Sequence, residues 1–190
     1  MPKTKLKLNA KQLRQRGPRP GELDQIKRLP ISIILDNIQD TFNIGSFFRL
    51  AEAIAAEKLY LCGDTVSPPN IKIHRASVGT WRWLPWEYHR SPIKLIKELK
   101  KKGYLVVAAE QAKKSIPYTK LKLKTPVALV VGHESNGISK EVLAIVDQII
   151  ELPLLGINRS LNVLVAASVI LYHWLEQLGI TRVKEKTNSA

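Results

Sequence analysis

Three polar segments of this 190-residue chain combine residue types that could bind a ligand. In residues 36–45 and just beyond, an amide at Asn43 and a guanidinium at Arg49 could bracket a phosphate or a ribose. Residues 131–139 contain two glycines, which let a backbone approach a ligand closely. Residues 151–163 form the third segment. Each segment follows a predicted β-strand, and ligands of α/β proteins bind at the carboxyl ends of strands.

Other common catalytic patterns are absent from the sequence. There is no GxGxxG after the first predicted strand and no GxxxxGK[ST] phosphate loop. The four histidines lack the spacing of metal ligands, and Ser135 lies in no nucleophile elbow. We therefore expect no metal site. A simpler interpretation of Asn43 or Ser160 alone is that each caps a helix, so the three segments together carry the functional signal.

Strands and helices alternate along the chain, which predicts an α/β fold. Continuous β-branched runs such as Ile31–Leu35 are typical of a parallel sheet that is buried on both faces. The other predicted elements are strands at Leu59–Cys62, Tyr104–Ala109, Val127–Val131 and Ile149–Leu152, and helices at Ile44–Ala56 (capped by Asn43), Pro92–Lys102, Ser139–Val146 and Ser160–Gln177. We expect residues 63–89 to be irregular. The prediction is a mostly parallel sheet with helices on both faces.

The domain organisation follows from composition. Residues 1–29 mix basic residues with Gly and Pro and predict an arm, residues 30–180 form the domain, and residues 181–190 form a tail. The single cysteine excludes an internal disulfide and fits a reducing compartment. The longest apolar run, Val163–Tyr172, is too short for a membrane span, and the N-terminus lacks the apolar core of a secretory signal. We expect a cytoplasmic protein without a membrane partner.

The last predicted helix is apolar on every face from Leu161 to Leu175. Such a helix must be buried on more than one side. In a chain of this length, that indicates a subunit interface as well as a core, and a homodimer is the simplest assembly. Leu171 and Trp174 share a helix face and are the predicted anchors of that interface.

The net charge of +14 is concentrated in two stretches. Residues 1–28 carry +7 and residues 72–124 carry +11. A surface selected for solubility alone is the alternative explanation, but it would intersperse both signs. A basic field of this size attracts polyanions, and nucleic acid is the usual partner.

The second basic stretch also contains aromatic residues. Trp81, Trp83 and Trp86 lie among arginines, a combination that suits unpaired RNA bases. Packing in the core is the alternative role for each tryptophan. The side chains that we expect to contact RNA are Arg75, Arg82, Arg90, Lys113 and Lys114.

Together, the three segments resemble the motifs of the SpoU (TrmH-type) RNA ribose methyltransferases of the SPOUT superfamily. The pattern Asn-x-Gly-x-x-x-Arg is matched by Asn43, Gly45 and Arg49, the pattern Gly-x-Glu by Gly132 and Glu134, and the pattern Leu/Ile-Pro…Ser-Leu-Asn-Val by Leu152, Pro153, Ser160, Leu161, Asn162 and Val163. Residues 75–86 resemble the segment between the first two motifs. The resemblance covers residues 31–177, most of the chain.

This resemblance implies methylation of a ribose 2′-hydroxyl in RNA with S-adenosyl-methionine as donor, an obligate homodimer and a C-terminal trefoil knot. It implies that Arg49 is catalytic, as a base or as a phosphate clamp, and that the site is organised by Asn43, Glu134, Ser160 and Asn162. The implied cofactor contacts are Gly132, Leu152, Leu161, Leu129 and Ile150. Many members have Gly where this chain has Ser135, which narrows the conformations open to that loop.

Alternatives remain at this level. A non-catalytic RNA-binding protein could retain the fold, but Arg49, Glu134 and Asn162 are all present. Methylation of a base nitrogen is another reaction, and the Ser160-Leu161-Asn162 segment favours ribose. Only about 30 residues precede the first predicted strand, too few for the RNA-binding domain common in members that act on ribosomal RNA. We therefore favour tRNA over rRNA.

Overall fold

A seven-stranded sheet forms the centre of the protein in a computed structural model, which describes residues 12–13 and 17–180. The strands are β1 (Leu29–Asp36), β2 (Ala56–Cys62), β3 (Trp86–His89), β4 (Leu105–Ala109), β5 (Ile116–Pro117), β6 (Val127–Gly132) and β7 (Gln148–Glu151). They lie in the order β3-β2-β1-β6-β4-β7-β5, and all neighbouring pairs are parallel. The predicted parallel sheet is confirmed. Residues 1–11 and 14–16 of the expected arm and all of the expected tail 181–190 lie outside the described residues.

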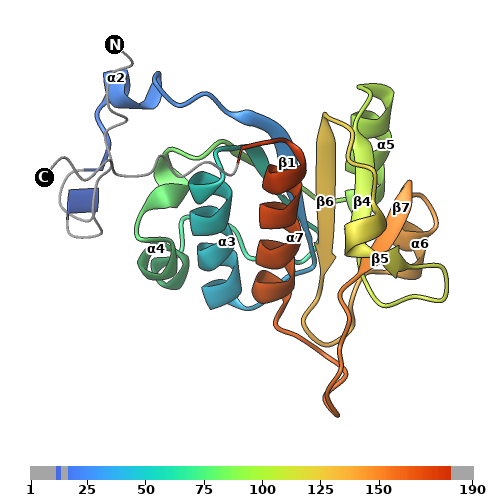
Figure 1. Cartoon of the computed structure of the whole chain (residues 1–190). Helices are drawn as coiled ribbons and strands as arrows, with labels where there is room; N and C mark the ends of the chain where they lie inside the picture. Colours follow the sequence, from blue (N-terminus) through green and yellow to red (C-terminus); the bar gives the residue numbers. More distant parts are fainter. Residues whose placement is uncertain (1–11, 14–16, 181–190) are drawn as a thin grey trace, which may run out of the picture.

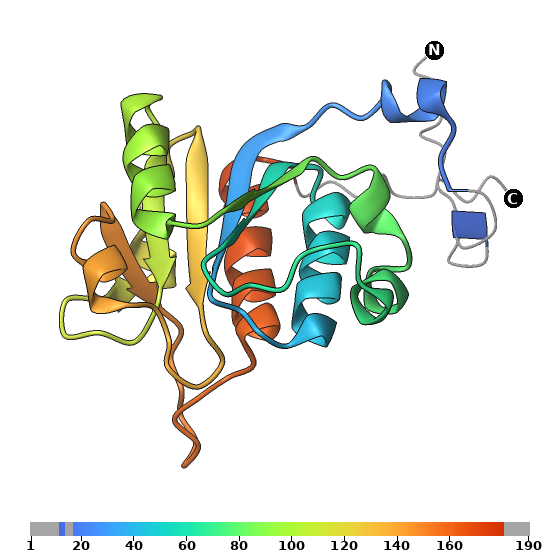
Figure 2. The same cartoon turned by 180° about the vertical axis from the view of Figure 1, so that it is seen from behind.

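Helices cover both faces of this sheet, as predicted (Figures 1 and 2). The helices are α2 (Pro20–Leu23), α3 (Thr41–Ala53), α4 (Ile71–Ser77), α5 (Pro92–Lys101), α6 (Lys140–Leu143) and α7 (Val163–Gln177), with the 3₁₀ turns η1 (Thr80–Arg82) and η2 (Tyr118–Lys120). One layer contains α3, α4 and α7, and the other contains α5 and α6.

Alternation along the strands divides the core between these two layers. In β1, Ile33 and Leu35 pack with α3 and α7, whereas Ile34 points to the opposite face and packs with α5. Successive side chains of a strand point to opposite faces, so a continuous apolar run fills both cores at once. This packing brings the carboxyl ends of β1, β6, β4 and β7 to one edge of the sheet.

Two of the predicted helix caps are wrong. Helix α3 begins at Thr41, because the carboxylate of Asp40 accepts a hydrogen bond from the Phe42 amide at 2.7 Å. Asn43 therefore lies inside the first turn. Helix α7 is capped by Asn162, whose Oδ1 accepts from the Leu164 amide at 2.9 Å, and not by Ser160. Several cap-forming residues precede each helix, and the sequence did not show which one supplies the cap.

Residues 63–89 are not irregular as expected, since they contain α4, η1 and β3. Asn70 caps α4, its Oδ1 accepting from the Lys72 amide at 2.8 Å and the Ile73 amide at 3.2 Å. The region is rich in Pro and Gly, which suggests loops, but Pro68 and Pro69 precede the cap and Gly79 follows the helix.

Helix α7 buries one face in the protomer and leaves another exposed. Leu171 and Trp174 are fully buried against the sheet and α3, so the prediction that they anchor a subunit interface is wrong. The exposed apolar side chains are instead Val165, Val169 and Tyr172, with exposures of 45%, 40% and 54%. Within the described residues, no helix is long and apolar enough to cross a membrane.

Candidate functional site

A cavity of about 390 Å³ opens at the carboxyl edge of β4, β6 and β7. Its walls come from the end of β4, from the loop after β6 and from the segment between β7 and α7, which projects past the sheet (Figure 1). The lining residues include Glu110, Gln111, Gly132, His133, Glu134, Ile150, Glu151, Leu152, Arg159, Ser160, Leu161 and Asn162. The cavity thus combines apolar side chains, backbone and carboxylates within the size range of small-molecule sites.

A chain of side-chain hydrogen bonds joins all three motif segments beside this cavity. The Asn43 amide donates from Nδ2 to Oε1 of Glu134 at 3.0 Å. Its Oδ1 accepts from Nδ2 of Asn162 at 3.2 Å, and Asn162 in turn caps α7. Asn43 is only 3% exposed, so its amide is committed to these two partners. The sequence interpretation in which Asn43 and Arg49 bracket a ligand is therefore wrong for Asn43, which joins the three segments.

The Glu134 carboxylate is held ionised by its donors. Burial by itself would raise the pKa of Glu134, but hydrogen bonds from Asn43, from its own amide and from the Gln39 and Asp40 amides outweigh burial and lower that pKa. The Gln39 and Asp40 amides lie 3.4 and 3.3 Å from the carboxylate. A carboxylate that accepts several hydrogen bonds favours its charged form. Glu134 therefore ties the loop after β6 to the start of α3.

Two motif glycines are required by close packing of the chain on itself. A Cβ at Gly132 would overlap the backbone of Gly137 and Ile138, where the loop after β6 closes. A Cβ at Gly45 would lie 2.9 Å from the carbonyl oxygen of Ile73 in α4. The sequence suggested that the glycines of residues 131–139 admit a ligand. Gly132 does line the cavity, and it also admits the neighbouring backbone of its own loop.

Four of the five expected cofactor contacts line the cavity, namely Gly132, Ile150, Leu152 and Leu161. Leu129 does not line it. It is fully buried within β6 among the residues that pack with α3 and α7. Ser160 lines the cavity and is exposed, with its hydroxyl 3.2 Å from Oδ1 of Asn158.

Arg49 lies apart from this cavity. It is exposed on α3 and lines a second hollow of about 490 Å³ with Leu164 and Ser168 of α7. In the sequence of α7, Leu164 and Ser168 directly precede the exposed Val165 and Val169. The site within one protomer brings together Asn43, Glu134, Ser160 and Asn162 but does not include Arg49.

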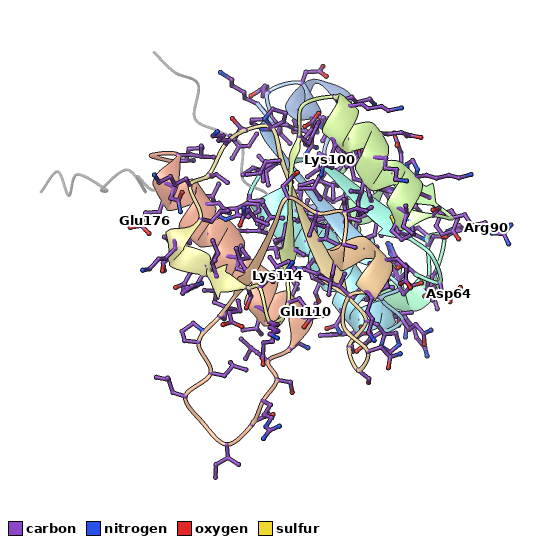
Figure 3. The ribbon with its side chains drawn as sticks, turned by 90° about the vertical axis from the view of Figure 1, so that its right-hand side faces the viewer. Asp64, Arg90, Lys100, Glu110, Lys114 and Glu176 are labelled. Atoms are coloured by element: carbon purple, nitrogen blue, oxygen red, sulfur yellow. The ribbon has the colours of Figure 1, made fainter. Side chains whose placement is uncertain are left out.

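The five expected RNA contacts form two groups, one near the outer strand β3 and the other near the outer strand β5 on the opposite side of the sheet. Arg75, Arg82 and Arg90 belong to α4, η1 and the end of β3, whereas Lys113 and Lys114 lie between β4 and β5. All five side chains are exposed, and Figure 3 shows Arg90 and Lys114 far apart on the molecule. The structure therefore does not join them into one patch.

The tryptophans next to the first of these groups are largely structural. Trp81 and Trp86 pack against the main core, and the ring of Trp86 meets Phe48 edge-on at 6.0 Å between ring centroids. The indole of Trp86 donates to the carbonyl oxygen of Trp81 at 3.1 Å, and that of Trp81 donates to His74 at 3.1 Å. The alternative of core packing is therefore correct for these two residues.

Sequence reasoning missed Glu110, Gln111, His133, Glu151 and Arg159, which also line the cavity. A signal was present for Glu110, because it directly follows a predicted strand at the functional edge. No group of three or more His, Cys, Asp or Glu residues that could hold a metal ion occurs in the described part of the chain.

We expect Asn43→Ala to lower the free energy of unfolding by about 1–3 kcal/mol, because it removes both hydrogen bonds that join the motif segments. Asn43→Asp should cost more, since its carboxylate would face Glu134. Urea denaturation measures both effects. The control is Asn136→Ala, an exposed asparagine in the same loop as Glu134. If Asn43→Asp is as stable as the parent, the hydrogen-bond chain does not exist in solution.

Several known proteins are similar to this chain in sequence or in overall fold. The tRNA (guanosine(18)-2′-O)-methyltransferase of Aquifex aeolicus is 30% identical over 161 residues, which are 84% of this chain and 75% of that protein. Among solved structures, the A. aeolicus TrmH/SpoU tRNA modifying enzyme superposes with a TM-score of 0.74 at 28% identity, covering 90% of this chain and 84% of that chain. The AdoMet-bound rRNA methyltransferase of Sinorhizobium meliloti gives a TM-score of 0.74 at 26% identity, covering 80% of this chain and 58% of that chain.

The family assignment agrees with the motifs from which the resemblance was drawn. The match to the family spans residues 30–172, and it includes all three segments that the hydrogen bonds of Asn43 join. This protein belongs to the SpoU rRNA Methylase family.

Proposed function

We propose that this protein methylates a ribose 2′-hydroxyl in RNA with S-adenosyl-methionine (AdoMet) as donor. The observation that carries the proposal is the Glu134–Asn43–Asn162 hydrogen-bond chain, which assembles the three family motifs beside one cavity. The relatives support the reaction, since one is named a 2′-O-methyltransferase and another is an rRNA methyltransferase with AdoMet bound.

The cavity fits this cofactor. Its apolar walls at Ile150, Leu152 and Leu161 suit an adenine ring, and the backbone of the loop after β6 offers polar groups to the ring edge. The Glu151 carboxylate suits a donor that carries positive charge. When bound, AdoMet supplies a methyl group on a cationic sulfur, which needs no metal ion or oxyanion hole.

The protein must align the acceptor hydroxyl with the methyl group and leave the hydroxyl proton a path to solvent water, which takes it up. We propose that Arg49 binds the target phosphate and polarises the 2′-hydroxyl as a cation. A guanidinium stays protonated at neutral pH, and its planar fork suits a phosphate. Asn43, Glu134 and Asn162 then hold the segments around the site.

A homodimer completes the proposal. Val165, Val169 and Tyr172 form an apolar stripe on the solvent face of α7, and Phe42 at the start of α3 is 67% exposed. Arg49 lies in the hollow next to this face, so a second copy of the chain packed there would adjoin the arginine. We propose that this contact, and not Leu171 or Trp174, forms the interface.

We also propose that the C-terminal part forms the trefoil knot of the family. Strand β6 lies between β1 and β4, and β7 lies beyond β4. The chain then returns across these strands, and α7 packs beside α3 against residues of β6 (Figures 1 and 2). This path, and the segment 152–162 that makes the return, support the proposal.

The favoured substrate is tRNA. The Aquifex relative named for tRNA shares 30% identity and most of its length with this chain, although the family also contains rRNA enzymes. The test is mass-spectrometric mapping of 2′-O-methylated nucleosides in RNA from cells with and without the gene. Loss of one 2′-O-methylated tRNA position supports the proposal. Loss from ribosomal RNA would change the substrate, and no loss from any RNA would contradict the activity.

We propose that the basic N-terminal segment contacts RNA, and deletion of residues 1–16 tests this. The deletion removes six Lys or Arg residues and no acidic residue. It keeps Arg28, whose Nη1 donates to the Ala56 carbonyl at 3.0 Å, so the body should remain folded. We expect weaker RNA binding and a shallower slope of log affinity against log salt, because phosphate contacts release counterions. Filter binding at several salt concentrations measures the slope, and an unchanged slope would show that the segment does not contact RNA.

A further inference from the structure

The loop after β6 is closed by a histidine side chain. His133 and Gly137 exchange two backbone hydrogen bonds, of 3.1 and 2.8 Å. Inside the turn, Nδ1 of His133 accepts from the Ser135 amide at 3.0 Å and from the Asn136 amide at 3.3 Å. An asparagine Oδ1 occupies the same place in a turn closed by its side chain. The imidazole therefore acts here as an acceptor that fixes the loop.

A carboxylate holds the same loop from outside. Oε2 of Glu110 accepts from the Ile138 amide at 2.9 Å, and Oε1 accepts from the Gln111 amide at 2.9 Å. Glu110, labelled in Figure 3, directly follows β4. Its side chain lines the cavity. Neither His133 nor Glu110 belongs to the motif residues that carry the family resemblance.

We propose that His133 and Glu110 are positioning residues that hold the loop 132–138 in the shape that binds AdoMet. This inference rests on the proposed function, since it takes AdoMet as the ligand of the cavity. A loop already fixed in its binding shape loses less conformational entropy when the ligand binds. Removing either side chain should therefore weaken AdoMet binding even though neither side chain needs to touch it.

The role of His133 depends on the acceptor at Nδ1. A ring nitrogen that accepts hydrogen bonds carries no proton, and Nδ1 accepts from both the Ser135 and the Asn136 amides. A side chain without an acceptor at this place leaves both amides without that partner, whereas an asparagine offers its Oδ1 instead.

Calorimetric titration of the full chain with AdoMet at pH 8 tests the proposal. His133→Ala and Glu110→Ala should each bind AdoMet about tenfold more weakly than the parent, as expected for the loss of two hydrogen bonds. His133→Asn should retain the affinity of the parent, because its Oδ1 can accept from the same amides. Glu141→Ala, an exposed glutamate on α6, is the matched control.

The outcomes separate this inference from the proposed function. No binding of AdoMet by the parent would overturn the proposed cofactor and this inference with it. Binding by the parent with equal affinity in both alanine variants would overturn the inference alone. If His133→Ala does not fold, His133→Asn still decides, because weak binding of AdoMet by this variant contradicts the role given to Nδ1.

Discussion

The Arg49→Ala variant should lose at least about 100-fold in methyl transfer while its AdoMet affinity stays close to that of the parent. Arg49 is exposed on α3 and does not line the cavity proposed for the cofactor, so its removal leaves the walls of that cavity unchanged. Arg49→Lys should also fail, because an ammonium lacks the planar fork that grips a phosphate. Calorimetry with AdoMet and a methyl-incorporation assay on tRNA give the two measurements.

The control for this experiment is Lys97→Ala, which removes one exposed positive charge from α5 on the opposite face of the sheet. It should leave transfer unchanged, which separates the role of Arg49 from a general loss of basic charge. Methylation by Arg49→Ala at a rate comparable to that of the parent would contradict the catalytic role of Arg49. Loss of AdoMet binding together with activity would instead move Arg49 to the cofactor site.

Val169→Glu should convert the protein from a dimer to a monomer and abolish activity. Val169 is 40% exposed in the middle of the apolar stripe on α7, so the protomer tolerates a charge there, whereas a desolvated interface does not. Light scattering should report about 43 kDa for the parent, twice the mass of the 21.4-kDa chain, and a single chain for the variant. Activity should fall with the dimer, because Arg49 borders the same face.

Two further variants distinguish this interface from the protomer core. Leu171→Glu should unfold the protein, since Leu171 is fully buried within one chain. Lys97→Glu places a carboxylate on an exposed position of the opposite layer and should stay dimeric. A parent that is monomeric at micromolar concentration and fully active would refute the proposed assembly, as would a Val169→Glu variant that remains a dimer.

Much of the fold is determined locally and could be predicted from the sequence. The apolar run of β1 identifies a strand buried on both faces, and Ser91-Pro92 correctly marks the start of α5. Alternation of such elements already requires a parallel sheet, whose carboxyl edge is the expected place for a ligand. The cavity lies at that edge. The sequence was ambiguous at the starts of α3 and α7, because several residues that can cap a helix precede each of them.

The roles of the site residues depend on contacts between distant parts of the chain. Asn43 is separated from Glu134 by 91 residues and from Asn162 by 119, and only the packed sheet brings the three together. Spacing along the chain could not show that this asparagine joins segments, because a side chain's partners are set by its tertiary neighbours.

Local sequence likewise does not determine which face of α7 is buried, nor which side chains hold the loop after β6. Leu171 and Val169 are both apolar residues of one helix, and the sequence by itself determined only that α7 is apolar throughout. Tertiary packing decided that Leu171 is covered by the sheet and α3 and that Val169 is left exposed. Likewise, the sequence determined that a Gly-x-Glu loop follows a strand, but the tertiary structure placed Glu110 against the Ile138 amide. The physical reason is that secondary structure follows from neighbours in the chain, whereas burial and hydrogen-bond partners follow from residues that the chain brings together only when it is folded.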